Sequence, residues 1–495
     1  MDQAIPLLVH DEHDEASLQE RSRPQVENEE NFDVGTAGSR TKWTTSLTST
    51  VKSTNFWAIL PHYVQPGGRQ KYQAKRSPTS YLDALRGYAA FLVYIYHCWD
   101  LPESPIFQFH FLRVPWIGGA GMVAIFFVIS GYVLSFRIVK LIRNEESAKL
   151  LDTLASSIFR RFLRLYLATG FATFVSACFV YVGWFVPYED LRQHTVLAQL
   201  SNWFGDFIHT SNPFADIQGW IHPKVFFTRY LAQMWTIPVE YRGSIVIFIF
   251  CTAACKLTTR ARLVLLWIVI FFSYYWRVAY VVEFMFGVFI AELSLVLHPE
   301  RHGRPALELV PDISTTQSDE KELLRRNRKA WAACATQVAS YSLLILGWFL
   351  LGQPEPPDLG LSGPWPWQYL HALIPTWYGE AAYTFWPSIA ACCVVLAIDL
   401  NTTLQRPFEW SFSQYLGDLS FGIYAMHIIL IHAVYKPVIL VWQKQYLGDS
   451  TVAYIPGAVA LTLLVFWAGD YFSRVDKKIV QFGRWLQAQL FVKWE

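Results

Sequence analysis

Ten long apolar stretches dominate the sequence after residue 80, and they constrain the fold more than any other feature. A transmembrane helix needs about 20 mostly apolar residues, and an isolated strand cannot satisfy its backbone polar groups in lipid. The stretches therefore predict membrane-spanning helices. The ten predicted spans are 84–101, 119–142, 163–186, 237–257, 261–276, 279–297, 331–351, 381–400, 416–434 and 452–472.

The charge composition agrees with this interpretation. Only 16% of the 495 residues are charged and 53% are hydrophobic, whereas a soluble domain has about 25% charged residues. The formal net charge of +2 is too small for a nucleic-acid-binding protein. We expect an all-α polytopic membrane protein with about ten transmembrane helices and no nucleic-acid partner.

Four regions follow from the distribution of polar residues. Residues 1–55 are rich in Ser, Thr and Glu, lack an apolar signal-peptide region and predict a disordered cytoplasmic tail. Residues 56–80 form a juxtamembrane segment and 81–475 the transmembrane domain, and 476–495 are expected to be a cytoplasmic C-terminal tail.

The Lys and Arg residues predict the orientation of the chain. Starting before the first span, alternate connections hold 28 of these residues and the opposite connections hold 7. Cytoplasmic loops are the ones enriched in Lys and Arg, so both termini are predicted to be cytoplasmic. The sequence does not distinguish the plasma membrane from an internal membrane.

The seven cysteines lie within or beside apolar stretches and show no zinc-type spacing. Cysteines in such surroundings usually act as small packing residues. We therefore expect no disulfide framework, no metal site and no bound cofactor.

The first predicted span contains an unusual pair of polar residues, Arg86 and His97. Eleven residues correspond to ~1100° around a helix, or about 20° after whole turns, and to roughly 16 Å along its axis. Arg86 and His97 thus share one face, on which Ala90 and Val93 are small. This face suits an extended anionic ligand, with a phosphate at Arg86 and a reactive group at His97.

Each residue also has a plainer interpretation. Arg86 alone is typical of an anchor at the cytoplasmic membrane edge. His97 alone suits a hydrogen bond to a neighbouring helix. The pair on one face, with small residues between, is more specific than either residue.

Arg86 and His97, and several motifs after them, resemble the acyltransferase 3 family of integral-membrane acyltransferases. The matching segments run in order along residues 80–475. They are 82–87 (LDALRG), 126–132 (FFVISGY), 160–165 (RRFLRL), 235–240 (WTIPVE), 284–287 (FMFG) and 416–421 (LGDLSF) followed by His427.

The resemblance implies transfer of an acyl group, usually acetyl, from acyl-CoA as co-substrate to a hydroxyl group. A neutral His is suited to deprotonate an alcohol near pH 7, so we expect His97 to be the catalytic base. No GxSxG motif or obvious cysteine nucleophile is present, which favours direct transfer. Arg86 is the predicted phosphate ligand.

The other motif residues have open roles. Arg160, Arg161 and Arg164 either anchor a helix entrance or assist in binding the CoA diphosphate, since Arg binds phosphate in a bidentate manner. Glu240 either orients His97 or pairs with Arg242. The remaining supporting residues that we predict are Asp83, Trp235 and His427.

The acceptor is less defined than the donor. Members of the family act on glycans, lipids and small natural products, and the long N-terminal tail looks most similar to fungal members. A terpenoid- or polyketide-like metabolite is therefore the expected acceptor, with a glycan as the other possibility. Two functions of other classes compete, namely a proton-coupled secondary transporter and a non-catalytic sensor. The sequence does not indicate an oligomeric state.

Overall fold

The computed structural model describes residues 56–73, 77–98, 109–187, 189–213, 228–298, 319–354 and 365–492, and the regular elements in these ranges are helices. The tail predicted at 1–55 lies outside the described residues. Each predicted span has a corresponding helix. These are α3 (Ser80–Cys98), α5 (Gly119–Arg143), α6 (Ser147–Tyr181), α8 (Thr236–Ala253), α9 (Thr259–Tyr275), α10 (Ala279–Leu297), α11 (Asp319–Leu350), α13 (Ala382–Leu400), α15 (Ser411–Leu430) and α17 (Tyr454–Leu490).

Eight of these helices are long and apolar enough, by length and composition, to cross a membrane. The other two are α9, which has 17 residues, and α3, which includes Asp83, Arg86 and His97 among its 19. The predicted all-α multi-pass membrane fold is confirmed. The orientation of the termini stays a prediction.

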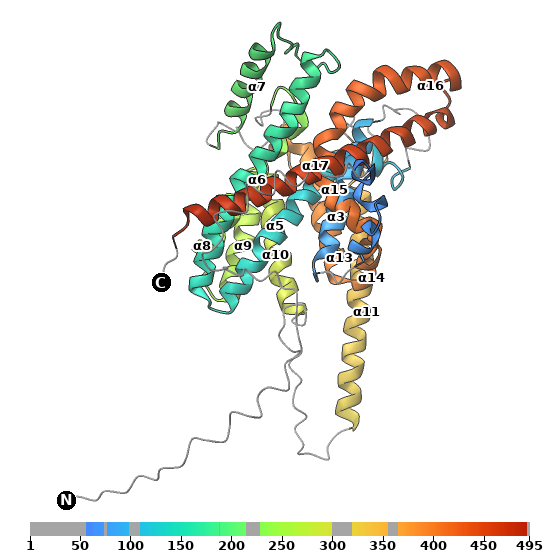
Figure 1. Ribbon diagram of the computed structural model, residues 1–495. Helices are drawn as coiled ribbons and strands as arrows, with labels where there is room; N and C mark the ends of the chain where they lie inside the picture. Colours follow the sequence, from blue (N-terminus) through green and yellow to red (C-terminus); the bar gives the residue numbers. More distant parts are fainter. Residues whose placement is uncertain are drawn as a thin grey trace, which may run out of the picture. The chain divides into compact units, whose positions relative to one another are not determined.

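Several helices continue beyond the apolar stretches that predicted them. Helix α6 has 35 residues and α17 has 37. Helix α17 ends at Leu490, so most of the predicted C-terminal tail is helical. Figure 1 shows α17 running across α15 and α6, and it packs against both.

Shorter helices connect the long ones. They are η2 (Phe56–Ile59), η3 (His62–Val64), α2 (Gly68–Lys71), α4 (Val114–Ile117), α7 (Val196–Thr210), η5 (Ala232–Trp235), α12 (Trp367–Ala372), η7 (Thr376–Ala381), α14 (Thr402–Gln405), η8 (Arg406–Glu409), η9 (Ile431–Ile439), α16 (Leu440–Leu447) and η10 (Thr451–Ala453).

Helices α3 and α15 run parallel in close contact, and two glycines make this contact possible. A Cβ atom at Gly87 would lie 2.4 Å from the carbonyl carbon of Leu416, and one at Gly417 would lie 2.6 Å from the carbonyl oxygen of Asp83. Small residues allow helix backbones to approach closely in lipid, where packing drives association. The glycines of two sequence motifs therefore form one crossing point.

A second crossing joins α5 and α10 in the same way. A Cβ atom at Gly131 would lie 2.1 Å from the carbonyl oxygen of Phe284, and one at Gly287 would lie 2.2 Å from that of Val128. These glycines also belong to motifs found in the sequence, 126–132 and 284–287. The motifs thus include the points where long helices touch.

The juxtamembrane segment is held against α15 and α17 by two carboxylates. The backbone N–H of His62 donates to Asp470 at 2.8 Å, and the Nδ1 of His62 lies 2.8 Å from the same carboxylate. The Tyr72 hydroxyl donates to Asp418 at 3.0 Å. Burial and the Asp418 carboxylate raise the pKa of Tyr72, so this hydroxyl stays a donor across the physiological pH range.

We expect a methyl group at the first crossing to separate α3 from α15. Replacing Gly87 with Ala places a Cβ atom within 2.5 Å of the α15 backbone, and such overpacking costs about 1–3 kcal/mol. The purified variant should unfold at a lower temperature in detergent than the wild type. Gly205→Ala is the matched control, because a Cβ at Gly205 on α7 meets nothing within 4 Å. Equal melting temperatures for the two variants would contradict this role of Gly87.

Candidate active site

Arg86 and the start of α3 form one end of the candidate site. The Arg86 Nε donates to the Ser420 hydroxyl of α15 at 3.1 Å. One of its terminal nitrogens lies 3.3 Å from the Asp83 carboxylate. The side chain of Arg86 is 33% exposed, so the guanidinium is fixed in position and still accessible.

Arg164 of α6 joins Arg86 at this end. Its charge interacts with those of Arg86, Asp83, Arg161 and Asp476, although its side chain is exposed. The exposed side chain of Arg164 therefore lies within electrostatic range of charged groups on both α3 and α17. Arg86 and Arg164 are 78 positions apart in the sequence, and the fold brings them close enough for their charges to interact.

Arg161 has a different environment. It forms an ion pair with Glu240 of α8, and the two side chains are only 11% and 16% exposed. Its Nε donates to Ser244 at 2.8 Å and a terminal nitrogen donates to Ser130 at 3.0 Å, while Ser130 also donates to Glu240. Three helices, α5, α6 and α8, meet at this network. The sequence did not suggest Arg161 as the partner of Glu240.

His97 lies near the other end of α3 against His427 of α15. The two imidazole rings stack with centroids 5.3 Å apart and an interplanar angle of 30°. His97 is exposed, whereas His427 is completely buried. The parallel packing of α3 and α15 therefore pairs two histidines that are 330 positions apart.

The protonation of the buried imidazole follows from its contact. The Nδ1 of His427 lies 3.0 Å from the Ile423 carbonyl oxygen. Because a carbonyl only accepts, Nδ1 carries the proton and Nε2 has the lone pair. Within the described residues, this Nε2 is buried and has no hydrogen-bond partner.

Tyr424 of α15 connects the start of α8 to the region around His427. The Tyr424 hydroxyl donates to the Gln233 carbonyl oxygen and lies 2.8 Å from the Thr236 hydroxyl. The rings of Tyr424 and His427 are 6.0 Å apart. Gln233 and Thr236 thus contact Tyr424, the aromatic neighbour of His427.

Two further predicted residues have contacts of their own. The Arg160 Nε donates to the Ser156 carbonyl of its own helix at 3.3 Å, a contact that suits a helix anchor. The Trp235 ring packs against Tyr280 with centroids 5.6 Å apart. Trp235 therefore supports the connection between η5 and α10.

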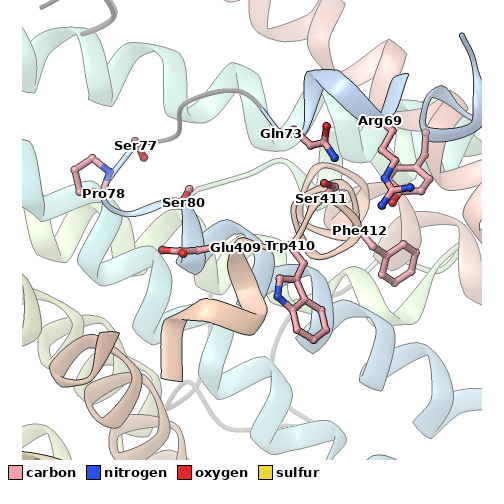
Figure 2. Close-up of a pocket in the computed structure, with 10 residues that line it drawn as sticks. Arg69, Gln73, Ser77, Pro78, Ser80, Glu409, Trp410, Ser411 and Phe412 are labelled. Carbon is pink, nitrogen blue, oxygen red and sulfur yellow. The ribbon is translucent and has the colours of Figure 1, made fainter. Parts of the chain in front are cut away.

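A cavity of about 790 Å³ opens where α3 and α15 begin. Figure 2 shows Arg69 and Gln73 from the juxtamembrane segment near Trp410 and Phe412. Its lining residues include Ser80 but none of the predicted site residues. Arg86 is six residues further along α3, or about 9 Å, so this cavity lies toward the arginine end of the site.

Comparison with known proteins agrees with this arrangement. The family model described as an acyltransferase domain matches residues 79–472, a range that includes the whole of α3, α5, α6, α8 and α15. The chain belongs to the acyltransferase 3 family. No solved structure matches this chain.

Two fungal relatives are similar over most of their length. The O-acetyltransferase PaAT-1 of Phomopsis amygdali is 29% identical over 447 residues, which cover 83% of this chain and 85% of the relative. The acyltransferase R4 of a Phoma species is 22% identical over 363 residues, covering 67% and 71% of the two chains. This acyltransferase 3 protein is a multi-pass membrane acyltransferase.

Sequence reasoning missed several residues of this candidate site. Ser420 and Asp476 neighbour the arginines. Tyr424 neighbours His427, and Gln233 contacts Tyr424. Ser420 belongs to a recognised motif, and Gln233 precedes another by two residues. Asp476 follows the predicted transmembrane domain by one residue, so the sequence did not indicate that it lies on a helix beside the arginines.

We expect the Arg161–Glu240 pair to stabilise the fold. Removing one partner of a buried ion pair leaves an uncompensated charge and costs about 3–5 kcal/mol. Arg161→Ala and Glu240→Ala should each lower the unfolding temperature. The double variant should lose less stability than the sum of the losses in the two single variants. A double-mutant cycle measured by thermal unfolding tests this coupling, and strictly additive losses would contradict it.

Proposed function

We propose that this acyltransferase transfers an acetyl group from acetyl-CoA to a hydroxyl group of a small-molecule metabolite. The observation that carries the proposal is the exposed imidazole of His97, stacked on His427 and in line with Arg86 on one face of α3. About 16 Å of helix separates Arg86 from His97. This separation suits a donor with phosphates at one end and a thioester at the other.

Arg86 and Arg164 are the proposed ligands of the CoA phosphates. A guanidinium has five N–H donors, and the contacts of Arg86 with Ser420 and Asp83 leave others for phosphate. Arg164 is exposed and lies in the same neighbourhood. Arg161 is neutralised by Glu240, so we assign it a supporting role in placing α6.

His97 acts as the general base in this proposal. It accepts the proton of the acceptor hydroxyl while the alcohol oxygen attacks the thioester carbonyl carbon. The new C–O bond forms, the C–S bond then breaks, and the protonated His97 returns the proton to the departing CoA thiolate. No acyl-enzyme is needed, because the hydroxyl attacks the donor directly.

His427 orients this base. Its Nδ1–H bond to Ile423 fixes the ring, and the stacking contact then fixes the plane of His97. Stacking occupies one face of the His97 ring and leaves the nitrogen lone pair, which lies in the ring plane, clear of His427.

The acceptor class is supported by the relatives. PaAT-1 is named an O-acetyltransferase, and both relatives come from fungi. We propose a hydroxylated terpenoid- or polyketide-like metabolite as the acceptor. In a strain that lacks the gene, metabolite profiling should show the loss of a compound and the gain of its non-acetylated form.

Replacing His97 with Ala should abolish acetyl transfer, since no other group in the proposal takes the acceptor proton. Labelled acetyl-CoA and membranes containing equal amounts of each protein provide the assay. The control is His194→Ala, which alters an exposed imidazole in the connection before α7 and should retain full activity. A well-expressed and fully active His97→Ala variant would refute the catalytic role, and a wild type without transfer would favour a carrier or sensor.

Replacing Arg164 with Ala should raise the KM for acetyl-CoA by about 10-fold or more. A hydrogen bond to a charged group contributes about 1.5–3 kcal/mol, and 1.4 kcal/mol corresponds to a factor of ten. Lys149→Ala is the control, because Lys149 lies on the same helix with a side chain that is 73% exposed. An unchanged KM with a lower melting temperature would show that Arg164 is only a helix anchor.

A further inference from the structure

The side chain of Gln233 in η5 is unusual for its lack of hydrogen bonds. Gln233 is 7% exposed, and within the described part of the chain neither its amide nitrogen nor its amide oxygen has a partner. Burying an amide without hydrogen bonds is unfavourable. A ligand that both donates and accepts would remove this cost.

Gln443 of α16 shows that burial alone does not identify such a site. Its amide is also buried without partners among the described residues, but it packs against Gly457 at the start of α17. Gln233 differs in its neighbours. Its carbonyl oxygen accepts the Tyr424 hydroxyl, and the Tyr424 ring is 6.0 Å from that of His427.

The position of Gln233 along the bundle separates it from the arginines. Helix α8 places Glu240 beside Arg161 and Thr236 beside Tyr424. Gln233 precedes Thr236 by three residues, so it lies on the side of Thr236 away from Glu240 along the chain. A group bound by Gln233 would therefore lie near Tyr424, apart from the Arg161–Glu240 pair.

We propose that the Gln233 amide binds the hydroxyl-bearing acceptor. This inference rests on the proposed acyl transfer. An amide is complementary to a hydroxyl group, because each both donates and accepts a hydrogen bond. The Nε2 of His427, whose ring lies 6.0 Å from that of Tyr424, is a second buried group without a partner among the described residues.

The test measures both substrates in membranes that contain wild type, Gln233→Leu or Gln443→Leu. Radiolabelled acetyl-CoA is the donor probe, and the acceptor probe is the non-acetylated compound purified from the deletion strain. We expect Gln233→Leu to raise the KM for the acceptor about 10-fold, the value of one hydrogen bond. The KM for acetyl-CoA should stay within about twofold, and Gln443→Leu should match the wild type in both constants.

Three outcomes would overturn the inference while leaving acyl transfer intact. They are an unchanged acceptor KM in Gln233→Leu, an equal effect of Gln443→Leu, or a rise confined to the KM for acetyl-CoA. If Gln233→Leu does not fold, Gln233→Met replaces it, because a flexible side chain of similar length fills the same space. A wild type that transfers no acetyl group would instead refute the proposed function.

Discussion

The close crossing of α3 and α15 is the contact on which the site depends. Gly87 and Gly417 lack the Cβ atoms that would hold the two backbones apart. Because the helices are parallel and in contact, residues at matching heights meet. Arg86 reaches Ser420 near the crossing, and His97 reaches His427 about three turns further along. A small change in the distance between the α3 and α15 backbones would therefore affect both ends of the site.

Buried charge is the second constraint on the bundle. Charged side chains within membrane spans are costly unless they are paired, and several of them are paired between helices in this chain. Glu240 joins α8 to Arg161 of α6, and Glu292 joins α10 to Arg143 of α5 and Arg262 of α9. These pairs fix helices around the site, while Arg86 and Arg164 keep the exposure that a phosphate ligand requires.

The helices and several motifs were predictable from local sequence, and the contacts between them were not. Apolar length located α3 and α17, and helical periodicity placed Arg86 and His97 on one face. The sequence left two partners open for Glu240, and the structure adds Arg161, which lies 79 positions earlier. The sequence did not mark Gln233 or Asp476 as site residues, since they are drawn into the candidate site by Tyr424 and Arg164, which belong to other helices.

By itself, the sequence determined that the chain is a bundle of membrane-spanning helices and that His97 and Arg86 share a face of the first span. These properties follow from hydrophobic length and from the 3.6-residue period, which act within one segment. Only the tertiary structure decided that His427 stacks on His97, that Arg164 joins Arg86 and that Arg161 pairs with Glu240. Such contacts depend on which helices pack together and at what height, and no single segment encodes that choice.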